Sequence, residues 1–185
     1  MQRFNKNSIG LFGGTFDPPH YGHLNISKES IKRFKLKKIY WVVTKKNPYK
    51  KKAFFSVDER IKKSNSLIKK NKKINVVFLD KKVKSSRTVD IYKYLQRKNK
   101  KSNFFIIIGS DSLVAFHKWK NWRYLVNNAK LVVFFRKGYG NKLKKSVITK
   151  VLESNNVIFV KNKSYNISSS KLRKNYLWSN IKWKY

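Results

Sequence analysis

Residues 8–24 read SIGLFGGTFDPPHYGHL. The segment from Ser8 to Phe12 is nearly continuous in apolar residues, which predicts a buried strand. Gly13 and Gly14 end that strand and allow the backbone to come close to a ligand. From His20 to Phe34 apolar side chains recur at steps of three and four residues, which predicts an amphipathic helix. The stretch therefore predicts a strand, a glycine-rich loop and a helix.

The alternation of strands and helices continues along the chain. Further apolar segments predict strands at Lys38 to Thr44, Ile74 to Leu79, Asn103 to Gly109, Lys130 to Arg136 and Val157 to Val160. Helical patterns occur at Val57 to Ile68, Thr88 to Arg97, Asp111 to His117, Asn121 to Asn127 and Lys145 to Glu153. Strands without polar alternation are typical of sheets covered on both faces. We predict a doubly wound, Rossmann-like α/β fold, with a mostly parallel sheet and ligands beyond its carboxyl edge.

The length of 185 residues fits a single domain. No linker or repeat divides the chain, so we expect one domain over residues 1–185, with a core from about residue 8 to 173 and a tail from 174 to 185. The absence of cysteine excludes disulfide scaffolds, thiolate metal sites and thiol nucleophiles, and favours a reducing cytoplasm. The apolar runs are far shorter than the roughly 20 residues that span a bilayer, so no membrane association is expected.

The composition is strongly basic, with 46 Lys and Arg against 8 Asp and Glu, a formal charge of +38. Such a charge attracts polyanions. The lysines are spread over every segment instead of one face or tail, which disfavours a nucleic-acid interface. A basic nucleic-acid-binding module nevertheless stays the alternative from a different functional class. Because carboxylates are scarce, we expect each one to have a structural or functional role. For Glu59 the expected role is structural, in a capping box with Ser56.

Two histidines follow the glycine-rich loop. His20 and His23 stand three residues apart at the start of a helix, so both rings can face the same side. A helix N-terminus favours anions, and the backbone amides of Gly13 and Gly14 can add donors, which together predict a phosphate cradle. The alternatives are one capping and one space-filling histidine, or a metal site. Only three other side chains could complete such a metal site, namely Asp17, Asp111 and His117. We expect no metal ligation by the histidines.

The string GGTFDPPHYGHL resembles the H-x-G-H signature of the nucleotidylyltransferase superfamily, and in its fuller form that of bacterial nicotinate-nucleotide adenylyltransferases. Other segments resemble motifs of the same family in the same order: Asn47-Pro48-Tyr49-Lys50, Thr88-Val89-Asp90, Gly109-Ser110-Asp111-Ser112-Leu113, Trp119, Arg136-Lys137-Gly138 and Ile167 to Arg173. The resemblance covers about Ser8 to Arg173. Lys137 stands where the family has proline, and Ser170 stands where it has threonine.

This resemblance implies an enzyme of NAD biosynthesis that joins ATP and nicotinate mononucleotide. The products are nicotinate adenine dinucleotide and pyrophosphate. The expected mechanism is direct in-line displacement without a covalent enzyme intermediate, in which the protein aligns the phosphates and neutralises their charge. Mg²⁺ is expected through the phosphates of ATP rather than in a protein cage.

The resemblance also implies the site residues, with His20 and His23 as the catalytic pair. The ATP-binding residues are expected to be Gly13, Gly14, Thr15, Phe16, His20, His23, Gly109, Asp111, Ser168, Ser169 and Arg173. The residues expected to bind nicotinate mononucleotide are Thr15, Phe16, Lys50, Thr88, Trp119 and Arg136. By residue chemistry alone the serines could equally cap a helix, and an aromatic residue such as Trp119 would more often belong to the core.

The alternatives within the superfamily are adenylyltransferases that act on nicotinamide mononucleotide or on phosphopantetheine. The phosphopantetheine enzymes usually carry threonine at the position of His20. His20, Trp119 and the Ile-Ser-Ser ending together favour the nicotinate enzyme. The sequence leaves open whether the chain forms a homo-oligomer.

Overall fold

The structure is a computed structural model, and it describes residues 7–45, 53–69, 71–136, 138–140, 143, 148, 156–161 and 167–181. Two predictions of the sequence fall wholly or largely outside these residues: the substrate-loop lysine, Lys50, and the helix from Lys145 to Glu153.

A six-stranded sheet with the strand order β3-β2-β1-β4-β5-β6 forms the centre of the molecule. Its strands are β1 (Ile9–Gly14), β2 (Lys38–Val43), β3 (Ile74–Val77), β4 (Phe104–Gly109), β5 (Lys130–Phe134) and β6 (Val157–Val160). Every pairing in the sheet is parallel. The order reverses between β1 and β4, where Ile9 pairs with Lys38 on one side and with Phe104 on the other. This is the Rossmann strand order, and it confirms the predicted fold class.

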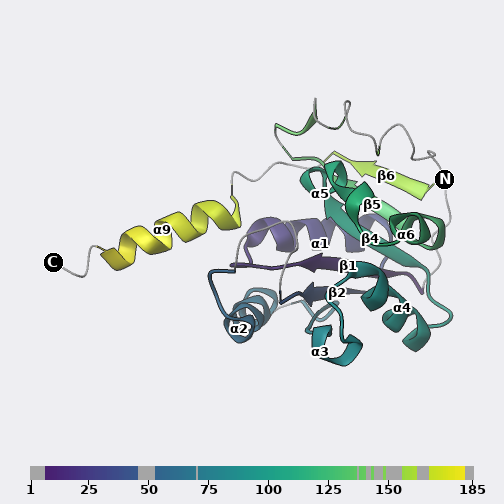
Figure 1. The fold of residues 1–185 in the computed structure, drawn as a ribbon, viewed down its shortest axis with the longest axis horizontal. Helices are drawn as coiled ribbons and strands as arrows, with labels where there is room; N and C mark the ends of the chain where they lie inside the picture. Colours follow the sequence, from purple (N-terminus) through teal and green to yellow (C-terminus); the bar gives the residue numbers. More distant parts are fainter. Residues whose placement is uncertain are drawn as a thin grey trace.

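Helices cover both faces of the sheet (Figure 1). They are α1 (Tyr21–Arg33), α2 (Val57–Ile68), α3 (Asp80–Val83), α4 (Thr88–Lys98), α5 (Ser110–Val114), α6 (Trp122–Asn128) and α9 (Ser169–Ile181), with a 3₁₀ helix η1 (Phe116–Lys118). The predicted capping box opens α2, since the amide of Glu59 donates to Ser56 Oγ at 3.2 Å and the amide of Ser56 donates to Glu59 Oε2 at 2.9 Å.

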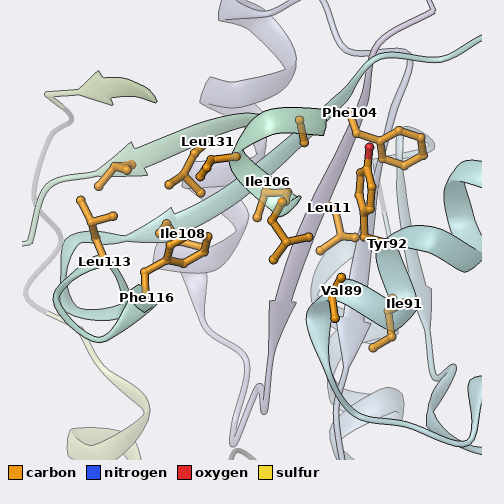
Figure 2. Packing of buried hydrophobic residues seen from close by; sticks show 14 of the residues in the cluster. Leu11, Val89, Ile91, Tyr92, Phe104, Ile106, Ile108, Leu113, Phe116 and Leu131 are labelled. Carbon is orange, nitrogen blue, oxygen red and sulfur yellow. The ribbon is translucent and has the colours of Figure 1, made fainter. Parts of the chain in front are cut away.

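Successive strand residues supply two separate cores, because side chains alternate across a sheet. Leu11 and Ile106 point to one face and pack with Tyr92 of α4 and Phe116 of η1 (Figure 2). The hydroxyl of Tyr92 donates to Asn128 O at 2.8 Å. Burial, more than the nearby Tyr124, raises the pKa of Tyr92 to about 12. Tyr92 is therefore a neutral core residue.

The opposite face carries the second core. There Phe12 and Phe105 pack with Leu24 of α1 and Ile68 of α2, and Trp41 is completely buried among them. Trp41 donates its indole N–H to Ser27 Oγ at 2.7 Å, which ties α1 to β2. Both faces of the sheet are thus filled, as the apolar strands predicted.

Some elements differ from the sequence-based expectation. The helix predicted from Asp111 to His117 is interrupted at Ala115, where α5 ends and η1 follows. The short helix α3 was not predicted, and it ends at Lys84 with a left-handed φ of 54°. The helix α9 runs past residue 173 to Ile181. In the part of the chain that the structure describes, no helix combines the length and apolarity needed to cross a membrane.

Candidate active site

The loops that follow the strands collect at the carboxyl edge of the sheet, and α9 begins near the same edge (Figure 1). The loop after β1 leads directly into α1. At Phe16 this loop adopts a left-handed φ of 48°, which costs an ordinary residue about 1–2 kcal/mol. The buried ring of Phe16 stacks on Trp41, with centroids 4.9 Å apart, and meets the edge of Phe12 at 5.7 Å. This aromatic packing offsets the backbone cost and holds the loop in one conformation.

The two histidines lie against each other at the start of α1. His20 is the N-cap residue and His23 is in the first turn, and their ring centroids are 3.8 Å apart. The amide of His20 donates to Nδ1 of His23 at 3.2 Å. Because Nδ1 of His23 accepts a hydrogen bond, a neutral His23 carries its proton on Nε2. The sequence-based expectation that both rings share one side of the helix start is confirmed.

His20 is buried, with 6% of its surface exposed. Burial lowers the pKa of His20 from 6.5 to about 4, and the positive charge of Arg136 contributes to this shift as the second cause. The imidazole is therefore neutral at pH 7 and can act as one donor and one acceptor. Within the described residues, its Nδ1 is buried and has no hydrogen-bond partner.

The lowered pKa of His20 predicts a pH dependence of stability. Between about pH 6.5 and pH 4 the unfolded state binds a proton at His20 that the folded state does not, so the free energy of unfolding falls as the pH falls through this window. Urea unfolding at pH 7 and at pH 4.5 measures this loss. The His20→Asn variant should lose less stability than the wild type over the same interval. An identical loss of stability in both proteins would show that His20 is not the source of the pH dependence.

Gly22, the glycine between the two histidines, packs directly on His20. A Cβ built on Gly22 would lie 2.9 Å from Cε1 and Nδ1 of His20 and 3.4 Å from Cγ2 of Ile167. The first contact is closer than real Cβ atoms tolerate, so a larger residue would push the His20 ring aside. The contact with the His20 ring explains why glycine occupies position 22. The contact with Ile167 shows that the C-terminal segment lies at the same place.

For the expected transfer from ATP to nicotinate mononucleotide, we expect Gly22→Ala to lower the kcat/KM for ATP about 10- to 100-fold while the protein stays folded. The reason is that small displacements of an aligning group are costly in catalysis. Steady-state kinetics together with circular dichroism measures both effects. Gly140→Ala is the matched control, since a Cβ at Gly140 meets nothing within 4 Å. Wild-type kinetics in Gly22→Ala would show that the position of the His20 ring is unimportant.

The start of α9 is attached to the loop after β1 by several contacts. Ser169 Oγ donates to Pro18 O at 2.9 Å. Arg173 donates to the backbone oxygen of Asp17, and its Nη1 lies 3.5 Å from the carboxylate of Asp17. Ser168 Oγ accepts from the amide of Lys171 at 3.2 Å, which is the capping role that the sequence left open. Segments more than 150 residues apart along the chain therefore lie side by side.

A second group of expected site residues follows β4 and β5, with Gly109 and Asp111 expected for ATP and Arg136 expected for nicotinate mononucleotide. Asp111 Oδ2 is 3.2 Å from Nη1 of Arg136, and the amide of Arg136 donates to Ser110 Oγ at 2.9 Å. A Cβ on Gly109 would lie only 2.4 Å from Asp111 Oδ1 and 3.0 Å from Arg136 Nε, so a larger residue would displace these two side chains. Oδ1 of Asp111 is buried without a partner among the described residues. The charge of Arg136 is close enough to His20 to lower the pKa of that histidine, so this group and the histidines belong to one site.

Two further residues expected to bind the mononucleotide, Thr88 and Trp119, lie at the same edge of the sheet but are not part of either group. Thr88 begins α4 and is half-buried, and Trp119 follows η1 and packs on Phe116 with centroids 4.9 Å apart. In the described residues, neither side chain is hydrogen-bonded to the histidines or to α9. The packing of Trp119 shows the core contact that the sequence had left as its alternative.

Two residues at the site were not predicted as site residues. Asp17 holds the amides of Phe54 and Phe55 at 2.8 and 2.9 Å and also pairs with Arg173. Two sequence signals could have singled it out, namely the scarcity of carboxylates and its place inside the string GGTFDPPHYGHL. Arg60 of α2 is completely buried next to the loop after β1, and no sequence signal marked it.

The Rossmann order, the glycine-rich loop and the imidazole and guanidinium groups at the carboxyl edge are the features of a nucleotide-binding α/β protein. The family described as cytidylyltransferase-like matches residues 11–175. A probable nicotinate-nucleotide adenylyltransferase of Pelagibacter ubique (strain HTCC1062) is 44% identical over 169 residues, covering 91% of this chain and 93% of that protein. The chain therefore belongs to the nicotinate-nucleotide adenylyltransferase family.

Other relatives agree with this assignment. A probable nicotinate-nucleotide adenylyltransferase of Buchnera aphidicola subsp. Acyrthosiphon pisum (strain Tuc7) is 32% identical over 189 residues, covering 94% of this chain and 87% of that protein. The solved structure of Plasmodium falciparum nicotinic acid mononucleotide adenylyltransferase complexed with NaAD superposes with a TM-score of 0.71. It is 22% identical and covers 91% of this chain and 83% of its own, so it supports the fold.

Proposed function

We propose that this protein joins ATP and nicotinate mononucleotide to give nicotinate adenine dinucleotide and pyrophosphate. The substrate pair comes from the names of its relatives. The observation in this chain that carries the proposal is the contact between the histidine-bearing loop and the start of α9, made by Arg173 and Asp17 and by Ser169 and Pro18. Imidazole, hydroxyl and guanidinium groups from the two segments are thereby brought to one place, as a triphosphate would require.

The reaction we infer is a direct displacement. A phosphate oxygen of the mononucleotide attacks the α-phosphorus of ATP, the bond to the bridging oxygen breaks, and pyrophosphate leaves with the electron pair. The attacking phosphate is already ionised near neutral pH, so the main task of the protein is to align the two substrates and to neutralise charge. Donors that are fixed before the substrates bind are the most effective for this purpose.

The geometry supports a specific division of labour. His20 and His23 would donate to the phosphates of ATP, and the amides of the glycine-rich loop would add further donors. Arg173, the Ser168 hydroxyl and the backbone amide of Ser169 at the start of α9 would hold the terminal phosphates. The orphaned carboxylate oxygen of Asp111 would accept hydrogen bonds from ribose hydroxyls of ATP.

The second substrate would bind along the same edge of the sheet. Thr88, at the N-terminus of α4, would receive the nicotinate carboxylate with its backbone amide, and Trp119 would contact the pyridine ring. Arg136 would hold the mononucleotide phosphate. Lys50, outside the described residues, stays a prediction for the same substrate.

Mg²⁺ belongs to the proposal as a companion of ATP. Among the residues that the structure describes, no three His, Cys, Asp or Glu side chains gather as a metal site. We infer that the cation is held mainly by substrate phosphates, which is the usual mode of Mg²⁺ in phosphoryl transfer. When bound, the cation would neutralise charge on the triphosphate.

The test is a product assay with purified protein, ATP and Mg²⁺ and with nicotinate mononucleotide, nicotinamide mononucleotide or phosphopantetheine. We expect pyrophosphate and the dinucleotide with the nicotinate substrate, at a kcat/KM at least about tenfold above that of the amide, since a charge-assisted hydrogen bond to the carboxylate contributes 1.5–3 kcal/mol. No product from any acceptor would refute the proposed enzyme. A preference for the amide would overturn only the specificity.

A further inference from the structure

Among the residues that the structure describes, Arg60 is the most deeply buried charged side chain, with 1% of its surface exposed. It lies on α2, and its guanidinium donates to backbone oxygens on three separate segments. The acceptors and distances are Thr15 O at 2.6 Å, Thr44 O at 2.8 Å, Phe55 O at 3.1 Å, Ser56 O at 3.2 Å and Lys45 O at 3.5 Å. These segments follow β1, follow β2 and precede α2. One side chain therefore holds together the loops at the carboxyl edge of the sheet.

Two buried carboxylates balance this charge. Asp17 and Asp80 are 5% and 8% exposed. Burial lowers the pKa of Arg60, while both carboxylates act in the opposite direction, so the guanidinium remains charged. Asp80 Oδ2 accepts from the amide of Lys45 at 2.7 Å and also from Ser86 Oγ at 2.5 Å. Buried charges of this kind are costly unless every one is paired, so the cluster calls for a role beyond packing.

The contact with Thr15 decides the orientation of one peptide group. In a planar trans peptide the carbonyl and the following N–H point in opposite directions. Because Arg60 holds Thr15 O, the N–H of Phe16 points away from Arg60. That N–H has no acceptor among the described residues. The ring of Phe16 is held by Trp41 at the same time, so the peptide is held from both ends.

We propose that Arg60 is a positioning residue for adenylyl transfer, which fixes the Thr15–Phe16 peptide so that the Phe16 N–H donates to a phosphate oxygen of the bound nucleotide. This inference rests on the proposed function. A donor that is held in place by a buried guanidinium needs no reorganisation when charge develops. Lysine could not replace Arg60, because an ammonium group is a compact point charge, whereas the guanidinium spreads five donors over a plane.

The first experiment compares Arg60→Lys with Ile68→Ala, a variant that removes a buried apolar side chain from the same helix. Both variants should lower the melting temperature. Kinetics are measured well below both melting temperatures, with the folded fraction determined by circular dichroism. We expect Arg60→Lys to lose about 10- to 100-fold in kcat/KM for ATP, mostly in kcat, and Ile68→Ala to keep constants within about twofold of wild type. Wild-type constants in folded Arg60→Lys would overturn the proposal.

The second experiment uses the wild-type chain and does not depend on the variant. The Phe16 amide resonance is followed by ¹⁵N–¹H NMR during titration with a non-hydrolysable ATP analogue and with inorganic pyrophosphate. We expect a downfield shift of the Phe16 proton with the analogue. An unmoved Phe16 resonance, while the rings of His20 and His23 respond, would overturn the inference. If the wild type makes no dinucleotide, the proposed function fails, and this titration still decides whether Phe16 donates to a nucleotide.

Discussion

Replacing His23 by alanine should lower kcat about 10²- to 10³-fold, which is the usual loss when one fixed donor to a developing negative charge is removed. The structure gives the reason. Nδ1 of His23 accepts from the His20 amide, and the ring lies 5.0 Å from Phe16 and 5.8 Å from Phe12. The ring is therefore fixed in orientation, with a proton on Nε2 when it is neutral. The measurement is the rate of pyrophosphate release at saturating ATP and nicotinate mononucleotide.

Tyr21→Ala is the matched control for this variant. Tyr21 lies in the same helical turn, but 64% of its surface is exposed, so we expect turnover within about twofold of wild type. Circular dichroism of both variants should show that the fold is retained. Wild-type turnover in folded His23→Ala would remove His23 from the catalytic pair.

Replacing Arg173 by alanine should raise the KM for ATP about 10- to 100-fold, since hydrogen bonds to charged groups contribute about 1.5–3 kcal/mol. Arg173 donates to the backbone of Asp17 and pairs with its carboxylate, and it is part of the turn that brings α9 to the loop after β1. Its removal would cost a proposed phosphate contact and also loosen the attachment of α9. Initial rates over a range of ATP concentrations measure the effect.

Two further variants sharpen this prediction. Lys174→Ala removes a neighbouring exposed cation from the same helix and should leave the KM for ATP nearly unchanged, which separates a specific contact from the general positive charge. Arg173→Lys keeps the charge but loses the planar arrangement of donors, so an intermediate KM is expected. A rise in the KM for nicotinate mononucleotide alone would assign Arg173 to the other substrate.

The fold could be predicted from the sequence because each strand is buried on both faces. The stretches at β4 and β5 are nearly continuous in apolar residues, and this pattern by itself implies helices above and below the sheet. The pairing of the histidine rings could be predicted as well, because a spacing of three residues at a helix start brings side chains together.

The internal contacts of the site could not be predicted in this way. Asp17 and Arg173 are 156 residues apart, and the contact depends on where α9 begins after β6. The pairing of Asp111 with Arg136 depends on the register of β4 and β5, in which Gly109 lies opposite Phe134. Local patterns carry no information about such tertiary contacts.

Arg60 shows the same limit most clearly. Nothing in the sequence marks Arg60 as a buried residue, and its proposed role depends on carbonyl groups of three loops that meet only in the folded chain. The break at Ala115 is a smaller case, because the sequence from Asp111 to His117 carries no proline or glycine that would mark it.

The most direct measurement is a crystal structure of the wild-type protein soaked with a non-hydrolysable ATP analogue and Mg²⁺. We predict that its three phosphates lie between the imidazoles of His20 and His23 and the guanidinium of Arg173, within hydrogen-bonding distance of both sides. Phosphates bound elsewhere, or held by only one of these two segments, would contradict the account.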